Sequence, residues 1–143
     1  MTGERTGAFW DAVEGRAPMP TAAKTLGWSL IQANPERGEI EVSFEATEDF
    51  LNPAGTVQGG FLTAMLDDTM GPALAATLDA GLYGATLELK VSFLRPARPG
   101  RLVGHGRVVH SGTTIAFLAG ELRDESGRVV AVGSATARIL RSG

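Results

Sequence analysis

Two glycines and an aspartate, placed around the start of one apolar segment, are the residues best suited to chemistry. Gly59 and Gly60 follow a loop rich in Asn, Pro and Gly, and Asp67 lies eight residues beyond Gly59. Glycines let another molecule approach the backbone closely. The N–H groups at the start of a helix lack intrahelical partners and favour negative charge. The pair therefore suits an oxyanion hole, and a carboxylate such as Asp67 suits a base or a nucleophile.

The spacing between Gly59 and Asp67 sets a geometric condition on that chemistry. Along a helix, eight residues span about 12 Å at ~1.5 Å per residue. One carbonyl cannot touch both groups of the same helix. If the two groups cooperate, they come from two chains whose helices run antiparallel, so the spacing predicts a dimer with shared sites.

The same residues also have ordinary structural interpretations. A Gly-Gly pair before a helix commonly forms a turn, and Asn52 is typical of loops. The neighbouring acids Asp67 and Asp68 could be a solvated pair on a helix surface. Their apolar neighbours, which include Met65 and Leu66, indicate instead that one of the two carboxylates points inward, and buried carboxylates are rare unless they are paired or functional.

The elements that must position these residues are one long helix and six strands. The segment from Phe61 to Leu78 predicts a buried helix that Pro72 interrupts and kinks. A short helix around Phe9, Trp10 and Val13 precedes the strands. Strands are predicted by alternation and by turn residues over Leu26 to Ala33, Glu39 to Ala46, Thr86 to Phe93, Arg101 to His110, Thr113 to Arg123 and Arg128 to Leu140.

These elements predict an α+β fold. Strands joined by tight turns form an antiparallel sheet, and a helix this apolar must be covered by it. We therefore expect an antiparallel β-sheet wrapped around one long central helix. We divide the chain into an N-terminal helical extension over residues 1–24 and a single domain over residues 25–143.

Composition narrows the classes of function. The 143 residues suit one domain, and the net charge of −3, with no cluster of Lys and Arg, argues against a nucleic-acid partner. The chain has no cysteine, which excludes a disulfide scaffold, a zinc-thiolate site and a cysteine nucleophile. The only histidines are His105, which shares strand parity with Arg101 and Arg107, and His110 beside a turn. We expect neither to be catalytic, and we expect no metal centre.

The sequence also shows no pattern typical of a secretory signal or of a membrane-spanning segment. Met1 to Trp10 contain Glu4 and Arg5 and no apolar run, which is not the pattern of a secretory signal. No stretch approaches the ~18 uninterrupted apolar residues of a membrane span. We therefore expect a cytoplasmic protein without a membrane partner.

The loop-to-helix junction resembles the hotdog thioesterases, in the branch of phenylacetyl-CoA (PaaI-like) and related acyl-CoA thioesterases. That family carries Asn-x-x-Gly-x-x-His-Gly-Gly and then an acidic residue nine positions after the His. The positions that match this pattern, apart from the His, are Asn52, Gly55, Gly59, Gly60 and Asp67. The resemblance continues through the strand from Thr86 to Pro96 and the turn from Ser111 to Thr114, and spans roughly residues 25 to 140.

The resemblance implies a hotdog fold, acyl-CoA thioester hydrolysis and a role for each residue. Asp67 would be the general base or nucleophile, the Gly59 N–H would polarise the thioester carbonyl, and Asn52 would position the attacking water. Thr86 falls where the family often has Ser or Thr near the thioester. The substrate-binding candidates are Gly60, Arg95, Gly112, Thr113 and Arg138, of which the last four would meet the CoA phosphates. The family uses no separate cofactor and forms homodimers with shared sites, often paired into homotetramers.

Gln58 stands where the family has its His. An amide side chain donates a hydrogen bond but does not titrate near neutrality. If the His only supports the loop or the carbonyl, Gln58 substitutes for it; if its proton chemistry matters, activity falls.

We therefore predict hydrolysis of an apolar acyl-CoA, aromatic or medium-chain, to free acid and CoA. Two other functions remain open. One is a non-catalytic acyl-CoA binding protein, which Gln58 favours and Asp67 disfavours. The other is an acyl-thioester hydratase, which usually pairs a His with an acid at the helix, and this helix carries no His.

Overall fold

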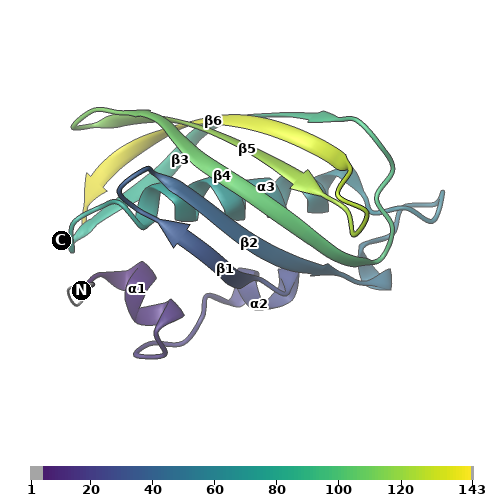
Figure 1. Ribbon diagram of the computed structural model, residues 1–143, viewed down its shortest axis with the longest axis horizontal. Coiled ribbons are helices and arrows are strands. Elements are labelled where there is room, and N and C mark those ends of the chain that lie inside the picture. The colour runs from purple at the N-terminus through teal and green to yellow at the C-terminus, as the bar shows by residue number, and fades with distance from the viewer. Residues whose placement is uncertain (1–4, 143) are drawn as a thin grey trace.

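A curved antiparallel sheet around one long helix makes up most of the molecule (Figure 1). The computed structural model describes residues 5–142. The helices are α1 (Ala8–Val13), α2 (Thr21–Leu26), the 3-10 turn η1 (Glu48–Phe50) and α3 (Gly59–Ala75). The strands are β1 (Ser29–Asn34), β2 (Glu39–Ala46), β3 (Leu82–Phe93), β4 (Gly100–Ser111), β5 (Ile115–Arg123) and β6 (Val129–Arg141). The predicted α+β arrangement is confirmed.

The six strands form one sheet in the order β1-β2-β4-β5-β6-β3, with every neighbouring pair antiparallel. The inner face packs on α3, where the chain buries residues such as Phe44, Leu102, Leu122, Met65 and Leu66. β1 and β3 are the two edges of the sheet. The long edge strand β3 follows α3 directly, so one sheet edge lies beside the helix that carries Asp67.

Glycines on the inner face let α3 lie close to the sheet. A Cβ atom added at Gly106 would come 2.7 Å from the Thr69 backbone oxygen, and one at Gly120 would come 2.9 Å from Met70 Cγ. Atoms do not approach so closely without displacement. The glycines thus form a trough in which α3 rests, and we call this feature the glycine trough (Gly84, Gly104, Gly106, Gly120 and Gly133).

α3 runs through Pro72, whereas the sequence predicted an interrupted and kinked helix from Phe61 to Leu78. It begins two residues earlier and ends three residues earlier than predicted. Pro72 has no N–H for the carbonyl of Asp68 four residues before it. The indole Nε1–H of Trp28 donates to that carbonyl at 2.8 Å instead. A side chain from outside the helix therefore satisfies the carbonyl that the proline leaves free.

The N-terminal region contains one more helix than predicted. Leu26 ends α2 and β1 begins at Ser29, so the predicted strand start at Leu26 was wrong. Gly27, with φ 68°, ends α2 in the left-handed conformation that favours glycine. α1 is attached to the domain through Phe9, whose ring meets Trp28 edge-on at 6.3 Å between centroids.

The domain boundary between residues 24 and 25 stays a prediction. It falls inside α2, and Met1 to Glu4 and Gly143, at the outer ends of the two predicted segments, lie outside the described residues.

Candidate active site

The start of α3 presents backbone N–H groups beside an aromatic ring. Gln58 is the residue before the helix; its side chain makes no capping hydrogen bond and is exposed. The backbone carbonyl of Gln58 accepts hydrogen bonds from the N–H groups of Phe61 and Leu62. The N–H groups of Gly59 and Gly60, which come first in the helix, bond to no backbone carbonyl within residues 5–142. The Phe93 ring covers Gly59 so closely that an added Cβ would lie 2.9 Å from its Cζ atom. Only glycine fits this position without moving the ring.

The Asn52 side chain is engaged within its own loop. Its Oδ1 accepts the backbone N–H groups of Ala54 and Thr56 at 3.0 and 3.1 Å, and its Nδ2 donates to the Thr56 hydroxyl at 3.0 Å. These bonds fix the loop that leads into α3. One of the two Nδ2 hydrogens remains available for a water or a ligand.

Asp67 faces β3 and is hydrogen bonded to it. The Thr86 hydroxyl donates to Asp67 Oδ1 at 2.9 Å. Thr86 stands at an irregularity of β3, because the pairing with β6 shifts between Thr86 and Glu88 and leaves Leu87 as an extra residue. Such bulges redirect side chains. The structure therefore brings together two of the predicted site residues, from α3 and from β3.

Asp68 lies in an apolar environment on another side of α3. Burial, and then the neighbouring charge of Asp67, raise its pKa to about 6. The residue lines a cavity beneath α1 and α2 together with Phe9, Ala12, Trp28 and Pro72, among others. Sequence reasoning considered the Asp67-Asp68 pair but assigned no role to Asp68. The apolar residues Phe9 and Trp10 indicated that α1 packs on the domain, but their pattern did not indicate that it packs beside Asp68.

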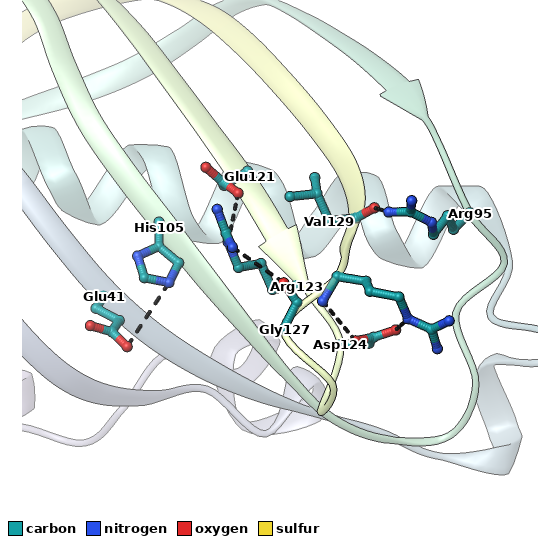
Figure 2. A network of polar contacts seen from close by, with 9 residues as sticks. Glu41, Arg95, His105, Glu121, Arg123, Asp124, Gly127 and Val129 are labelled. Atoms are coloured by element: carbon teal, nitrogen blue, oxygen red, sulfur yellow. Dashed lines mark hydrogen bonds and ion pairs between the residues drawn. The ribbon is translucent and has the colours of Figure 1, made fainter.

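The four candidates for CoA binding fall into two groups. Gly112, Thr113 and Arg138 gather at one end of the sheet: Arg138 pairs with Ile115 on β5 and with Ala85 on β3, and the Gly112 N–H donates to the Ile115 carbonyl. Arg95 lies at the other end, where its Nη1 donates to the Val129 carbonyl at 3.2 Å (Figure 2).

The end of the sheet that carries Arg95 is also the end at which α3 begins. The Val57 N–H, in the loop before α3, donates to the Ala97 carbonyl, two residues beyond Arg95. The structure therefore places Arg95 with the Gly59 end of α3, and it places Arg138 beside the β3 segment that contains Thr86.

Neither histidine lies at this site. His105 is on the outer face of the sheet, 4.0 Å from a Glu41 carboxylate oxygen (Figure 2), and His110 is exposed near the end of β4. Among residues 5–142, no group of three or more His, Asp or Glu side chains is arranged to hold a metal ion. In the same part of the chain, no helix combines the length and the apolarity that a membrane crossing needs.

Comparisons with known proteins agree with the fold. The family model described as Thioesterase superfamily matches residues 54–131. Human acyl-coenzyme A thioesterase 13 is 27% identical over 110 residues, which cover 76% of each chain.

Solved structures give the same result. A phenylacetic acid degradation-related protein from Ralstonia eutropha JMP134 is 42% identical, with a TM-score of 0.88, and the match covers 91% of this chain and 98% of that one. The PaaI protein of the E. coli phenylacetic acid degradation operon shares the fold, with a TM-score of 0.80 at 24% identity and 94% of each chain covered.

An antiparallel sheet wrapped around one helix, with an acidic residue on that helix beside an edge strand, defines a protein of the hotdog class. Over half of the chain matches the family model, and the chain belongs to the thioesterase superfamily. The predicted family and the predicted class of enzyme, a thioesterase, are therefore confirmed.

Proposed function

We propose that the protein hydrolyses an apolar acyl-CoA, aromatic or medium-chain, to the free acid and CoA. The observation that carries this proposal is the Asp67 carboxylate, which is half-buried on α3 and held by the Thr86 hydroxyl at 2.9 Å. Membership of the thioesterase superfamily and the acyl-CoA named for the human relative support the choice of substrate.

In this proposal Asp67 acts on water or on the thioester itself. As a base, it takes a proton from water while the water oxygen bonds to the carbonyl carbon. The Gly59 N–H stabilises the oxyanion, the C–S bond breaks, and the proton passes to the CoA sulfur. As a nucleophile, Asp67 attacks the carbonyl carbon, and the C–S bond breaks so that CoA leaves as the thiolate. Water then hydrolyses the resulting anhydride to the free acid and the Asp67 carboxylate, and the thiolate takes up the proton that is released. Thr86 orients the carboxylate, and the free Nδ2 hydrogen of Asn52 suits a contact with the water.

The geometry of the helix supports shared sites in a homodimer, or in a homotetramer built from dimers. Gly59 and Asp67 lie in one continuous α-helix, about 12 Å apart along its axis at ~1.5 Å per residue. The edge strand β3 exposes Tyr83 at 47%, Leu87 at 59% and Phe93 at 53%. Unpaired edges with apolar side chains favour pairing with another chain. A second copy placed antiparallel along β3 would bring its Gly59 and Arg95 toward Asp67.

Gln58 fits hydrolysis better than hydration. The exposed amide can donate to a carbonyl but cannot supply a proton near neutral pH. A hydratase of this fold would need an imidazole at the helix start, and His105 and His110 lie elsewhere. Simple acyl-CoA binding without turnover is the alternative that the experiment must exclude. A cytoplasmic location stays a prediction.

The test is the Asp67→Asn variant, assayed by release of free thiol from a panel of aromatic and aliphatic acyl-CoAs. We expect turnover to fall by about 10²-fold or more, because the amide cannot accept the proton or attack the carbonyl. The exposed Asp79→Asn is the matched control and should keep the wild-type rate. A near-wild-type rate for Asp67→Asn would exclude the assigned role. Binding of acyl-CoA by the wild type without thiol release would favour the non-catalytic alternative.

A further inference from the structure

A cavity of about 180 Å³ lies between the N-terminal helices and α3. Its walls are almost entirely apolar and come from α1, from α2 and the residues on either side of it, and from α3. They include Phe9 and Ala12 of α1, Ala23 of α2, Trp28 after α2, and Pro72 of α3. Asp68 is the one ionisable residue among those that line it. The family match over residues 54–131 covers the α3 wall but none of the N-terminal wall. The N-terminal wall therefore lies outside the part of the chain that carries the proposed catalytic residues.

The size and chemistry of this cavity limit what it can hold. Apolar cavities of about 150 Å³ accept a ligand the size of benzene, so this one suits a group of about six carbon atoms. A carboxylate in apolar surroundings is costly unless a hydrogen-bond donor reaches it. Burial, and then the charge of Asp67, raise the pKa of the Asp68 carboxyl. Within residues 5–142, no hydrogen bond or ion pair stabilises its charged form. A ligand that is apolar along its length and carries a donor at its far end would satisfy both the apolar walls and the carboxyl.

The surface of α3 between the two carboxylates is open. Successive residues of a helix are turned by about 100°, so Asp67 and Asp68 leave α3 in different directions. Ala64 and Gly71 fall between them around the helix. Ala64 is exposed, and a Cβ added at Gly71 would meet no atom within 4 Å. A chain held at Asp67 can therefore cross this surface to the cavity without displacing a side chain.

We propose that the cavity beneath α1 holds the distal end of the substrate's acyl group, and that Asp68 selects acyl groups that end in a hydrogen-bond donor such as a hydroxyl. This inference rests on the proposed function, because it takes the thioester to lie at Asp67. It assigns a specificity-determining residue and gives the N-terminal helices a function: they form the wall of the acyl pocket.

The test separates binding from hydrolysis by using Asp67→Asn as the background. The dissociation constants of hexanoyl-CoA and 6-hydroxyhexanoyl-CoA, two ligands of equal carbon number, are measured by calorimetry at pH 7.5. We expect the hydroxylated ligand to bind about tenfold more tightly, since a hydrogen bond to a charged group is worth this much or more. Adding Asp68→Leu should reverse the preference, because the leucine side chain accepts no hydrogen bond. Glu36→Leu, an exposed acid in the β1–β2 turn, is the matched control for loss of charge.

A second variant tests the cavity from its other wall. Ala12→Leu fills the space from α1 and should weaken both six-carbon ligands about tenfold relative to acetyl-CoA, which is too short to reach the cavity. Ala22→Leu is the control, because Ala22 lies on the exposed side of α2 and outside the cavity. It should leave the affinity for the six-carbon ligands relative to acetyl-CoA unchanged.

The outcomes distinguish the two proposals. Thiol release by the wild type, together with equal affinities that Asp68→Leu does not change, would overturn this inference and leave the proposed function standing. An Asp68-dependent preference without thiol release would support the pocket and reject hydrolysis. No binding of either ligand would reject both.

Discussion

Asp67 and Asp68 are neighbours in the chain, but their surroundings differ. Asp67 accepts a hydrogen bond from the Thr86 hydroxyl, whereas Asp68 faces the apolar cavity beneath α1. Burial and the Asp67 charge raise the pKa of Asp68 to about 6. Adjacent carboxyls in unlike environments are a common way for one protein to give two acids different tasks. Here the tasks that we assign are chemistry for Asp67 and recognition for Asp68.

The raised pKa of Asp68 predicts a pH-dependent stability. In the folded protein this carboxyl holds its proton up to about pH 6, whereas an unfolded Asp loses it near the ordinary value of 3.8. The folded state thus binds more protons between these values, and its stability falls as pH rises from about 4 to 6. Asp68→Asn removes this loss, so it should raise the free energy of unfolding at pH 7 by on the order of 1–2 kcal/mol.

At pH 3.5 the same substitution should have little effect, because the carboxyl is then neutral in the folded protein. Urea unfolding at the two pH values measures the difference. An equal effect at both values would mean that ionisation of Asp68 does not cost stability.

At the residue scale, the motif spacing predicted that Asp67 lies within the long helix, and the family resemblance marked Thr86 as a residue near the thioester. The hydrogen bond between the two side chains was not predicted and is seen only in the structure. The sequence could not predict the surroundings of Asp68 either. Those depend on Phe9 and Trp28, which are far from Asp68 in the chain and reach it only through tertiary packing. The carboxylate that points toward apolar surroundings, which the sequence led us to expect, is Asp68, whereas Asp67 is the one tied to β3.

At the element scale, α3 depends on a side chain outside it. The Trp28 indole occupies the Asp68 carbonyl that Pro72 cannot bond. Trp28→Phe should therefore lower the free energy of unfolding by about 1–3 kcal/mol, the usual cost of leaving a polar group without a partner in a part-buried place. Pro72→Ala in the same background should recover part of this loss, since the backbone N–H that the alanine introduces can then bond the carbonyl.

Chemical denaturation of the two single variants and the double variant measures this coupling. If Pro72→Ala stabilises the protein equally in the wild-type and the Trp28→Phe backgrounds, the indole is not the substitute donor.

The elements that the sequence predicted well are those with a clear period. β2 has the predicted bounds of Glu39–Ala46, and the other strands differ by a few residues at their ends. The elements that it missed lack such a period. α2 is six residues long with two buried positions, Ala23 and Leu26, too few to define a helical face. Pro72 was interpreted as a break because a partner from outside the helix is invisible in a local pattern.

At the scale of the whole molecule, the proposed sharing of sites between two chains predicts complementation between two inactive variants. One chain carries Asp67→Asn. The other carries Gly59→Pro, which removes the backbone N–H. It also carries Phe93→Ala, because the Phe93 side chain would otherwise clash with the ring of the new proline. A mixed dimer would hold one intact site, built from Gly59 of the first chain and Asp67 of the second. Random mixing of the two chains should therefore restore about a quarter of the wild-type activity.

Phe93→Ala alone is the control for the background of the second chain. Thiol release after the mixed chains are unfolded and refolded together measures the effect. No recovery, with mixed dimers shown to form, would place each site within one chain.

The glycine trough has a consequence for how this protein can change its substrate. With α3 lying on the sheet at van der Waals contact, no room remains for a ligand between helix and sheet. In the proposed pocket, the distal end of the acyl group therefore lies on the side of α3 away from the sheet, where residues of the N-terminal segment 8–28 form the wall. Substitution of a wall residue such as Ala12, which lines the cavity, should therefore alter what is bound with little effect on the packing of α3 against the sheet. Trp28 is different, because it lines the cavity and also satisfies the Asp68 carbonyl, so that its substitution should change both binding and stability.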